Sequence, residues 1–376
     1  MQEWGGVAAL VVLGLLLGCS ENDGSLITGD AEGAPREIAA EPRLALGVTA
    51  GDTLQEFHRV ATPFLLPDDR IVVPLRSDGV LRIFDEEGEF LESLGGAGEG
   101  PGEFVGLRAA WPRGDTIEAV DSRLRRVTRF LPDGGIEVIS LEGDGPVETV
   151  VPGAWAEGWV TMGIAGAGHG FRDEIVLHGF SMEEGPLGEL GRVEGMKRIS
   201  GSGVAGPHPL SPRAVYRIGR GELFVAETET PRIQVWSPEG AVMREFEWEA
   251  RDRSSRSAAM AIVRASPNLE WFYEALIADA EVPDRLSIFW DFLVDELGFL
   301  WIREYEPELH ASALGGMARE GGDGPWRIFA PSGVEVGSVE VPQGLRPTQI
   351  KEEAIVGIRV DSLGVEFVHV HGLTRD

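Results

Sequence analysis

The feature that most constrains the fold is a repeat of short β-type runs, each ending in an aromatic residue that a glycine follows four or five positions later. The residues between are turn formers such as Asp, Glu, Pro and Ser, and a glycine adopts the positive φ that tight hairpins require. Each unit therefore predicts a strand, a turn and a second strand. The five pairs are Phe84–Gly88, Phe130–Gly134, Phe180–Gly185, Trp236–Gly240 and Phe329–Gly333.

A second repeated element precedes these hairpins. It is a polar turn followed by a short apolar strand, and it occurs six times, as in "PDDRIVVPL", "GRGELFVAE" and "EEAIVGIRVD". A unit of about four strands is a small twisted sheet that cannot bury both of its faces alone, whereas sheets arranged radially cover one another. The repeat therefore predicts an all-β fold, a six-bladed β-propeller over residues 44–373.

The last unit, Ala354–Leu373, lacks a closing hairpin. An open ring would leave an exposed sheet edge, which natural proteins avoid. The segment Arg43–Leu66 offers additional strands. We therefore expect the propeller to be closed by an N-terminal strand that joins the C-terminal blade.

A glycine-rich stretch, "GAGEGPGEF", runs from Gly96 to Phe104. It does not fit a dinucleotide-binding loop, because Pro101 stands where a third glycine is needed and no helix pattern follows. We interpret it as a connection between blades, with Phe104 in the core and Glu103 bonding backbone amides. The stretch and the repeat resemble NHL-like six-bladed propellers, in particular a bacterial extracytoplasmic group with the motif GxGPGEF. That resemblance implies the fold and secretion, and no assigned activity.

The N-terminus carries an apolar run of 11 residues, Val7–Leu17, which is too short to span a membrane and suits a signal peptide. The run ends in Leu-Leu-Gly-Cys, which resembles the lipobox of bacterial lipoproteins, although Glu3 stands where a basic residue is usual. The resemblance implies a signal peptide over residues 1–18, lipid attachment at Cys19 and a location in the cell envelope, in either leaflet. Residues 19–43 are predicted to form a flexible tether. An ordinary signal peptide or a buried N-terminal helix remain the alternatives.

The charge is unbalanced, with 62 acidic and 33 basic residues and a formal net charge of −29. Such a surface repels nucleic acids and anionic lipids, so we expect no nucleic-acid partner and membrane contact only through the lipid anchor. Cations, basic proteins or neutral ligands are favoured instead. The identity of a protein or small-molecule partner does not follow from the sequence.

Catalytic motifs such as G-x-S-x-G and H-E-x-x-H do not occur in the sequence. His369 and His371 have metal-ligand spacing on one face of a predicted strand, but no third ligand can be named, and outer-face polar residues of a last strand are the simpler interpretation. Six-bladed lactonases, which the chain resembles in fold, hold a divalent cation with carboxylates and asparagines. Here only Asn22 and Asn268 exist, in the tether and in an insertion. We expect no cofactor, although a carboxylate calcium site remains open.

The repeat is interrupted at about residues 251–286. Asn268 can cap a helix over Leu269–Ala280, whose apolar stripe includes Phe272 and Leu276. This insertion packs on the propeller rim, or else forms a lid or a docking site.

Two functions follow from these observations. The favoured one is a lipid-anchored extracytoplasmic propeller that binds a ligand or protein without catalysis. The alternative is a metal-dependent hydrolase or lyase with its site at the pore, as in six-bladed lactonases. Three or more carboxylates converging on one mouth of the pore would favour the enzyme.

Overall fold

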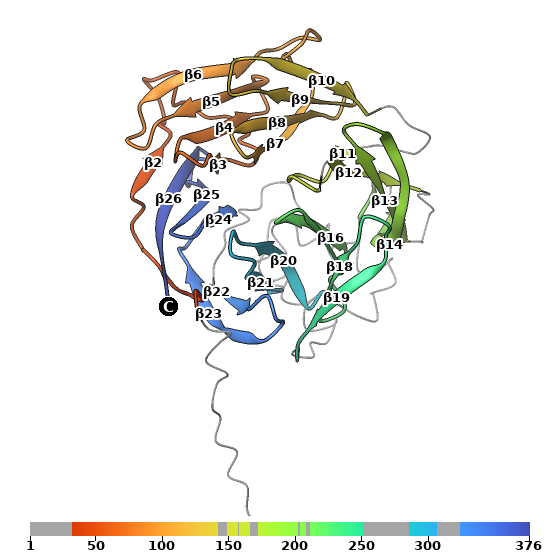
Figure 1. Cartoon of the computed structure of the whole chain (residues 1–376). Coiled ribbons are helices and arrows are strands. Elements are labelled where there is room, and N and C mark those ends of the chain that lie inside the picture. Colours follow the sequence, from red (N-terminus) through yellow and green to blue (C-terminus); the bar gives the residue numbers. More distant parts are fainter. Residues whose placement is uncertain are drawn as a thin grey trace, which may run out of the picture.

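The protein is a ring of six antiparallel sheets (Figure 1). The computed structural model describes residues 32–141, 149–156, 158–165, 172–201, 204–207, 211–250, 286–306 and 324–376. These described residues contain no helix. The predicted all-β, six-bladed propeller is therefore confirmed. The predicted helix Leu269–Ala280, with Asn268, Phe272 and Leu276, lies outside the described residues, as do Cys19 and Asn22.

Successive sheets follow the order of the chain. The first holds β3 (Phe64–Leu65), β4 (Ile71–Leu75), β5 (Val80–Phe84) and β6 (Phe90–Gly95), and the second β7 (Leu107–Arg113), β8 (Thr116–Asp121), β9 (Arg126–Phe130) and β10 (Ile136–Ser140). The third holds β11 (Thr149–Val150), β12 (Gly158–Ile164), β13 (Arg172–Ser181), β14 (Gly185–Gly201) and β15 (Val204–Pro207). The fourth holds β16 (Ala214–Gly219), β17 (Glu222–Glu227), β18 (Arg232–Trp236) and β19 (Val242–Glu247), and the fifth β20 (Phe289–Val294), β21 (Leu300–Glu304), β22 (Gly324–Phe329) and β23 (Glu335–Val341). The sixth holds β24 (Leu345–Ile350), β25 (Ala354–Val360) and β26 (Glu366–Arg375), together with β1 (Pro35–Ile38) and β2 (Leu44–Leu46).

The aromatic–glycine repeat forms the hairpin between the third and fourth strands of the first five sheets. Its glycines, at positions 88, 134, 185, 240 and 333, all have φ between 78° and 92°. In the first hairpin Asp85 N donates to Glu89 O over 3.0 Å and Gly88 N donates to Asp85 O over 3.1 Å. A side chain with Cβ is disfavoured at this φ, which explains the repeated glycine.

The hydrophobic core lies between neighbouring sheets, in six clusters of buried side chains. Phe84 of the first sheet packs with Val356 of the sixth, and Trp111 of the second packs with Trp159 of the third. Each blade therefore buries its two faces only in the presence of both neighbours.

The N-terminal strands β1 and β2 both pair with β26, with Ile38 opposite Leu373 and Leu44 opposite Val370. Ile38 and Leu46 are buried. Part of the segment assigned to the flexible tether is thus strand β1. The physical reason is that β26 presents an unpaired edge, and the apolar residues of this short segment fill gaps beside it.

The glycine-rich stretch is architectural, as predicted. Phe104 is buried, and Glu103 accepts a hydrogen bond from Gly100 N over 2.8 Å. Arg126 of β9 donates to the carbonyl oxygens of Glu99, Gly100 and Glu103, which ties the loop to the second sheet. The loop therefore joins two blades and holds no phosphate cradle.

Candidate functional site

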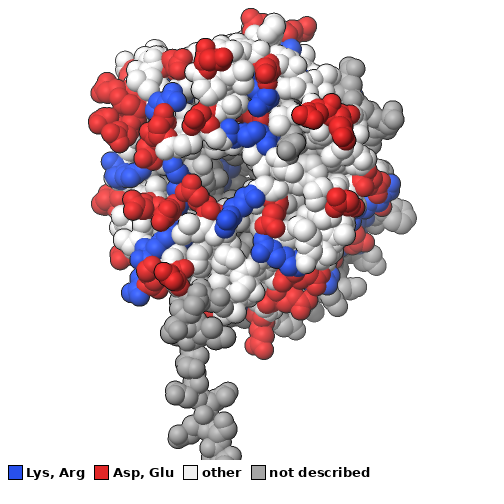
Figure 2. Space-filling model, in the orientation of Figure 1, with Lys and Arg blue, Asp and Glu red and all other residues white. Residues whose placement is uncertain are grey.

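The ring has two mouths, which we name by the direction of the inner strands β3, β7, β11, β16, β20 and β24. The upper mouth lies where these strands begin, and the lower mouth where they end. Figure 2 shows a central hollow, acidic side chains around the rim, and a few Lys or Arg side chains beside the hollow. Basic side chains stand at both mouths.

At the lower mouth, basic side chains bond the neighbouring blade. Arg113, which ends β7, donates to Ala156 O over 3.0 Å and to Gly158 O over 2.7 Å in the third sheet. Arg220 donates to Leu297 O over 2.9 Å, and Lys351 donates to Leu66 O over 3.1 Å. These three cations join adjacent blades, so we assign them a structural role.

At the upper mouth, two arginines of the first sheet lie side by side. An isolated bridge pairs Val60 with Leu75, so Arg59 and Arg76 form the next pair along these two segments. Arg76 N donates to Arg59 O over 3.2 Å. Arg59 has a φ of 57°, outside the extended conformation of a strand, so the two residues are joined by this backbone bond next to the bridge.

Arg108 of the second sheet reaches the same level. Thr62 Oγ1 donates to Ala110 O over 3.1 Å, which sets the height of β7 beside the segment that leads into β3. Arg108 stands two residues before Ala110. Its side chain is exposed, whereas Leu107 and Ala109 on either side are buried.

Arg346 of the sixth sheet lies on the other flank. Thr348 Oγ1 donates to Pro63 O over 2.7 Å, and Gln349 Oε1 accepts a hydrogen bond from Leu65 N over 2.8 Å. These bonds fix β24 against β3, so Arg346, two residues before Thr348, comes level with Ala61. We call Arg59, Arg76, Arg108 and Arg346 the arginine quartet.

The other three members of the quartet affect the charge of Arg76. The pKa of its guanidinium is lowered, first by partial burial and then by the positive charges of Arg108, Arg59 and Arg346. The carboxylate of Glu366 opposes this shift, and its Oε2 accepts a hydrogen bond from Val60 N over 2.8 Å. Arg76 therefore lies near three other positive side chains and one carboxylate.

This arrangement suits recognition of oxygen anions. A guanidinium is a planar fork of N–H donors that matches a carboxylate, phosphate or sulfate edge. Several forks on different blades can share one anion. The net charge of the chain gave no sign of this site, because the four arginines come from distant parts of the sequence.

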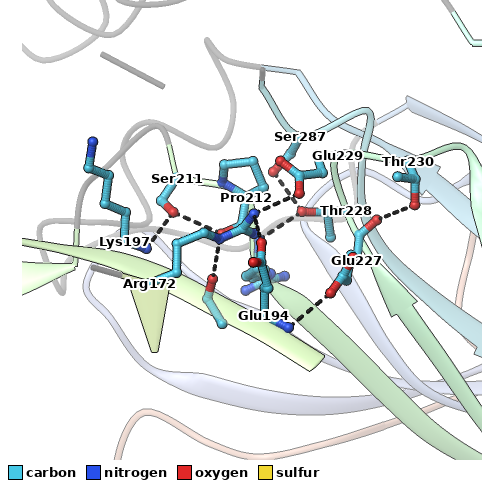
Figure 3. A network of polar contacts seen from close by, with 12 residues as sticks. Arg172, Glu194, Lys197, Ser211, Pro212, Glu227, Thr228, Glu229, Thr230 and Ser287 are labelled. Atoms are coloured by element: carbon cyan, nitrogen blue, oxygen red, sulfur yellow. Dashed lines mark hydrogen bonds and ion pairs between the residues drawn. The ribbon is translucent and has the colours of Figure 1, made fainter. Parts of the chain in front are cut away.

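A second polar cluster, shown in Figure 3, joins the third, fourth and fifth sheets. Arg172 Nη1 donates to Glu194 Oε2 over 2.7 Å and to Glu229 Oε1 over 2.6 Å (Figure 3). Thr228 and Ser287 share a hydrogen bond of 2.8 Å between their buried hydroxyl groups. The arginine here is neutralised by carboxylates, so this cluster is a link between blades and not an anion site.

The predicted pair His369 and His371 lies on β26 and is buried. His371 Nδ1 is 2.8 Å from Ala39 O, and the two imidazole rings have centroids 5.6 Å apart. Within the described ranges, no group of three or more His, Cys, Asp or Glu side chains is placed to hold a metal ion. Both side chains are packed within the last sheet, so the interpretation as outer-face polar residues is wrong.

Burial of this pair predicts a dependence of stability on pH. Burial, followed by the charges of His371 and Arg359, lowers the pKa of His369 from 6.5 to about 4. The unfolded chain binds this proton first, so the contribution is complete above pH 6.5 and is lost as the pH falls toward 4. The effect on the free energy of unfolding is about 3 kcal/mol.

Urea unfolding at about pH 7 and about pH 4.5 measures this effect, with His369→Gln as the comparison. The wild-type protein is expected to lose about 2–3 kcal/mol more than the variant over this interval. Equal losses in the two proteins would contradict the prediction. The pKa of His371 is also lowered by burial and by Arg359, and the bond to Ala39 and the charge of Glu41 partly offset this.

Among the described residues, no helix has the length and apolar character that crossing a membrane requires. No protein-family model and no curated protein matches the sequence.

Solved structures resemble the chain in fold. A "Putative exported protein" from Bacteroides fragilis superimposes with a TM-score of 0.50 at 11% identity, covering 89% of this chain and 94% of that one. A member of the DUF4221 family from Bacteroides vulgatus gives 0.48 at 11% identity, covering 90% and 98%. A gluconolactonase from Xanthomonas campestris gives 0.45 at 10% identity, covering 90% and 100%. At 11% identity, the similarity to the exported protein shows the fold alone.

Proposed function

We propose that the protein is an exported, lipid-anchored β-propeller that binds an anionic ligand at the arginine quartet and performs no catalysis. The observation that carries this proposal is the placement of four arginines from three adjacent blades at one mouth. Like-charged groups held together reduce stability, and such arrangements are typical of functional sites. The resemblance to extracytoplasmic NHL-like propellers supports export.

Because of the quartet, we propose an anionic ligand, whereas the sequence favoured cations, basic proteins or neutral ligands. The net charge of −29 favours cations or neutral ligands. Salt screens exposed charges beyond about 8 Å at physiological ionic strength, so the charges nearest to a bound ligand dominate its binding. Those charges are mainly positive at the upper mouth.

Residues next to β1 bond the end of β26 at the lower face. Gly33 N donates to Asp376 O over 3.2 Å, and Arg375 Nη1 donates to Gly33 O over 2.9 Å. We further propose that β1 and β2 close the ring.

The anion site is tested with the trisulfonated dye pyranine, whose fluorescence anisotropy rises on binding. Arg108→Gln and Arg346→Gln are each expected to weaken dye binding at least tenfold, because each removes charge-assisted hydrogen bonds of about 1.5–3 kcal/mol. The melting temperature of Arg108→Gln without dye should be unchanged or slightly higher, since Arg108 is exposed and like-charge repulsion is relieved.

Arg220→Gln is the matched control, since it removes one arginine from the lower mouth. It should bind the dye as the wild-type protein does. Equal dye affinity in all four proteins would remove the basis of the proposed function.

Lipid anchoring is tested separately at Cys19. Cys19→Ala should leave the protein unprocessed or soluble, because the attached acyl chains are the proposed anchor. The measurement is fractionation of membranes after a high-salt wash. A variant that remains in the washed membrane fraction would show that the lipobox interpretation is wrong.

A further inference from the structure

We propose that His369 and His371 form a binding site for one soft monovalent metal ion of the cuprous (Cu⁺) class. This inference goes beyond the anion site and does not depend on it. Both residues lie on β26, where side chains two positions apart share a face, and their exposed fractions are 7% and 2%. Three features of the pair carry the inference: the free nitrogen of His371, the spacing of the two rings and the charges around them.

The hydrogen bond of His371 determines which of its ring nitrogens is free. Its Nδ1 lies 2.8 Å from Ala39 O, and a carbonyl oxygen only accepts, so Nδ1 carries the proton. In the neutral ring Nε2 is then a bare acceptor, and it is buried without a partner in the part of the chain that the structure describes. An acceptor buried in this way reduces stability. A backbone carbonyl bonded to the other ring nitrogen is the usual support of a histidine that binds a metal.

The two rings are spaced to share one ion. Their centroids are 5.6 Å apart. A metal–nitrogen bond is about 2.0–2.1 Å long, so two imidazole centroids on one ion lie about 5.2 Å apart at a tetrahedral angle and about 6.4 Å apart in a linear arrangement. The observed spacing lies between these limits. The residues opposite His369 in the sheet are Gly357 and Ala45, whose small size leaves room beside its ring.

The ligands and their surroundings favour a monovalent ion. Two neutral imidazoles supply no negative charge, and the charges that act on His371 are those of Arg359 and Glu41, one of each sign. Within the described ranges, no third His, Cys, Asp or Glu side chain completes a three-ligand site with the pair. A divalent ion in this buried position would lack ligands and countercharge, whereas Cu⁺ accepts two nitrogen ligands.

Titration of the full-length chain with Ag⁺ tests the site, because Ag⁺ has the charge and d¹⁰ shell of Cu⁺ and does not change oxidation state in air. All proteins carry Cys19→Ala, which removes the single cysteine and its thiol. Isothermal titration calorimetry in a chloride-free buffer at about pH 7.5, where an ordinary imidazole is neutral, should show one Ag⁺ bound per chain. His369→Gln and His371→Gln should each weaken this binding at least about tenfold, because each removes one of two ligands. His58→Gln, at an exposed position outside the pair, is the matched control and should bind Ag⁺ as the parent does.

Histidine-selective ¹⁵N labelling of the parent chain gives a measurement that needs no substitution in the pair. The ring nitrogen resonances of His369 and His371 should shift together as the first equivalent of Ag⁺ is added, and Zn²⁺ should require a concentration at least about 100-fold higher. No shift of this pair at one equivalent, with or without shifts of other histidines, would overturn the site. Equal or tighter binding of Zn²⁺ by the pair would overturn the monovalent class.

Discussion

Replacing Glu118 with alanine is expected to lower the free energy of unfolding by about 3–5 kcal/mol, because it leaves a buried ionic network without its acceptor. The Glu118 side chain is fully buried. Its Oε2 accepts hydrogen bonds from Trp111 Nε1 and Trp159 Nε1, each 2.8 Å long. Its Oε1 accepts from Arg113 Nε over 2.7 Å and from Arg129 Nε over 3.3 Å. One carboxylate thus serves donors from both the second and the third sheet.

Urea unfolding measures the effect, and Glu137→Ala is the matched control. Glu137 is the other acidic partner of Arg129, and its side chain is 47% exposed. An exposed ion pair contributes about 1 kcal/mol at most, so this variant should change stability little. Glu118→Gln keeps the shape but loses the charge, and an intermediate loss is expected. If Glu118→Ala is no more harmful than Glu137→Ala, the carboxylate does not hold the two blades together.

The blades could be predicted from the sequence because their signals are local. A glycine at positive φ, the turn residues before it and an aromatic residue at the end of the strand all lie within about six positions of one another. The burial of Phe104 was predictable for a related reason. It is a large aromatic residue directly after a glycine-rich turn, and such a side chain is most stable in the core.

The arginine quartet could not be predicted, because it depends on the heights at which three inner strands pack. Those heights are set by contacts such as Thr62 to Ala110 and Thr348 to Pro63, which join distant parts of the chain. Glu118 was missed for the same reason, since its indole and guanidinium partners lie on three other strands. Strand β1 was missed because a strand of four residues that begins with proline has too little periodicity to be distinguished from a tether.

Removing the N-terminal strands is expected to have a still larger effect. A chain that begins at Gly47 should lose at least about 5 kcal/mol relative to one that begins at Glu32. Burial of a Leu or Ile side chain contributes about 1.5–3 kcal/mol, and both Ile38 and Leu46 are buried. The truncation also leaves the edge of β26 without a partner. Differential scanning calorimetry of the two proteins gives the comparison.

The two strands should matter because they contact different neighbours of the last blade. Ala34 and Ile38 pack with Trp326 of the fifth sheet, whereas Leu46 packs with Phe84 of the first.

Point substitutions in the full-length chain separate this role from any effect of truncation. Ile38→Ala and Leu46→Ala should each cost about 2–5 kcal/mol, while Glu37→Ala, at an exposed position of β1, should change stability by about 0.5 kcal/mol or less. An unchanged melting temperature for the truncated chain would show that the ring does not need these strands. A loss on truncation with no effect of Ile38→Ala or Leu46→Ala would show that these two side chains do not carry the stabilisation, and would assign it to the backbone pairing with β26 and the other residues removed.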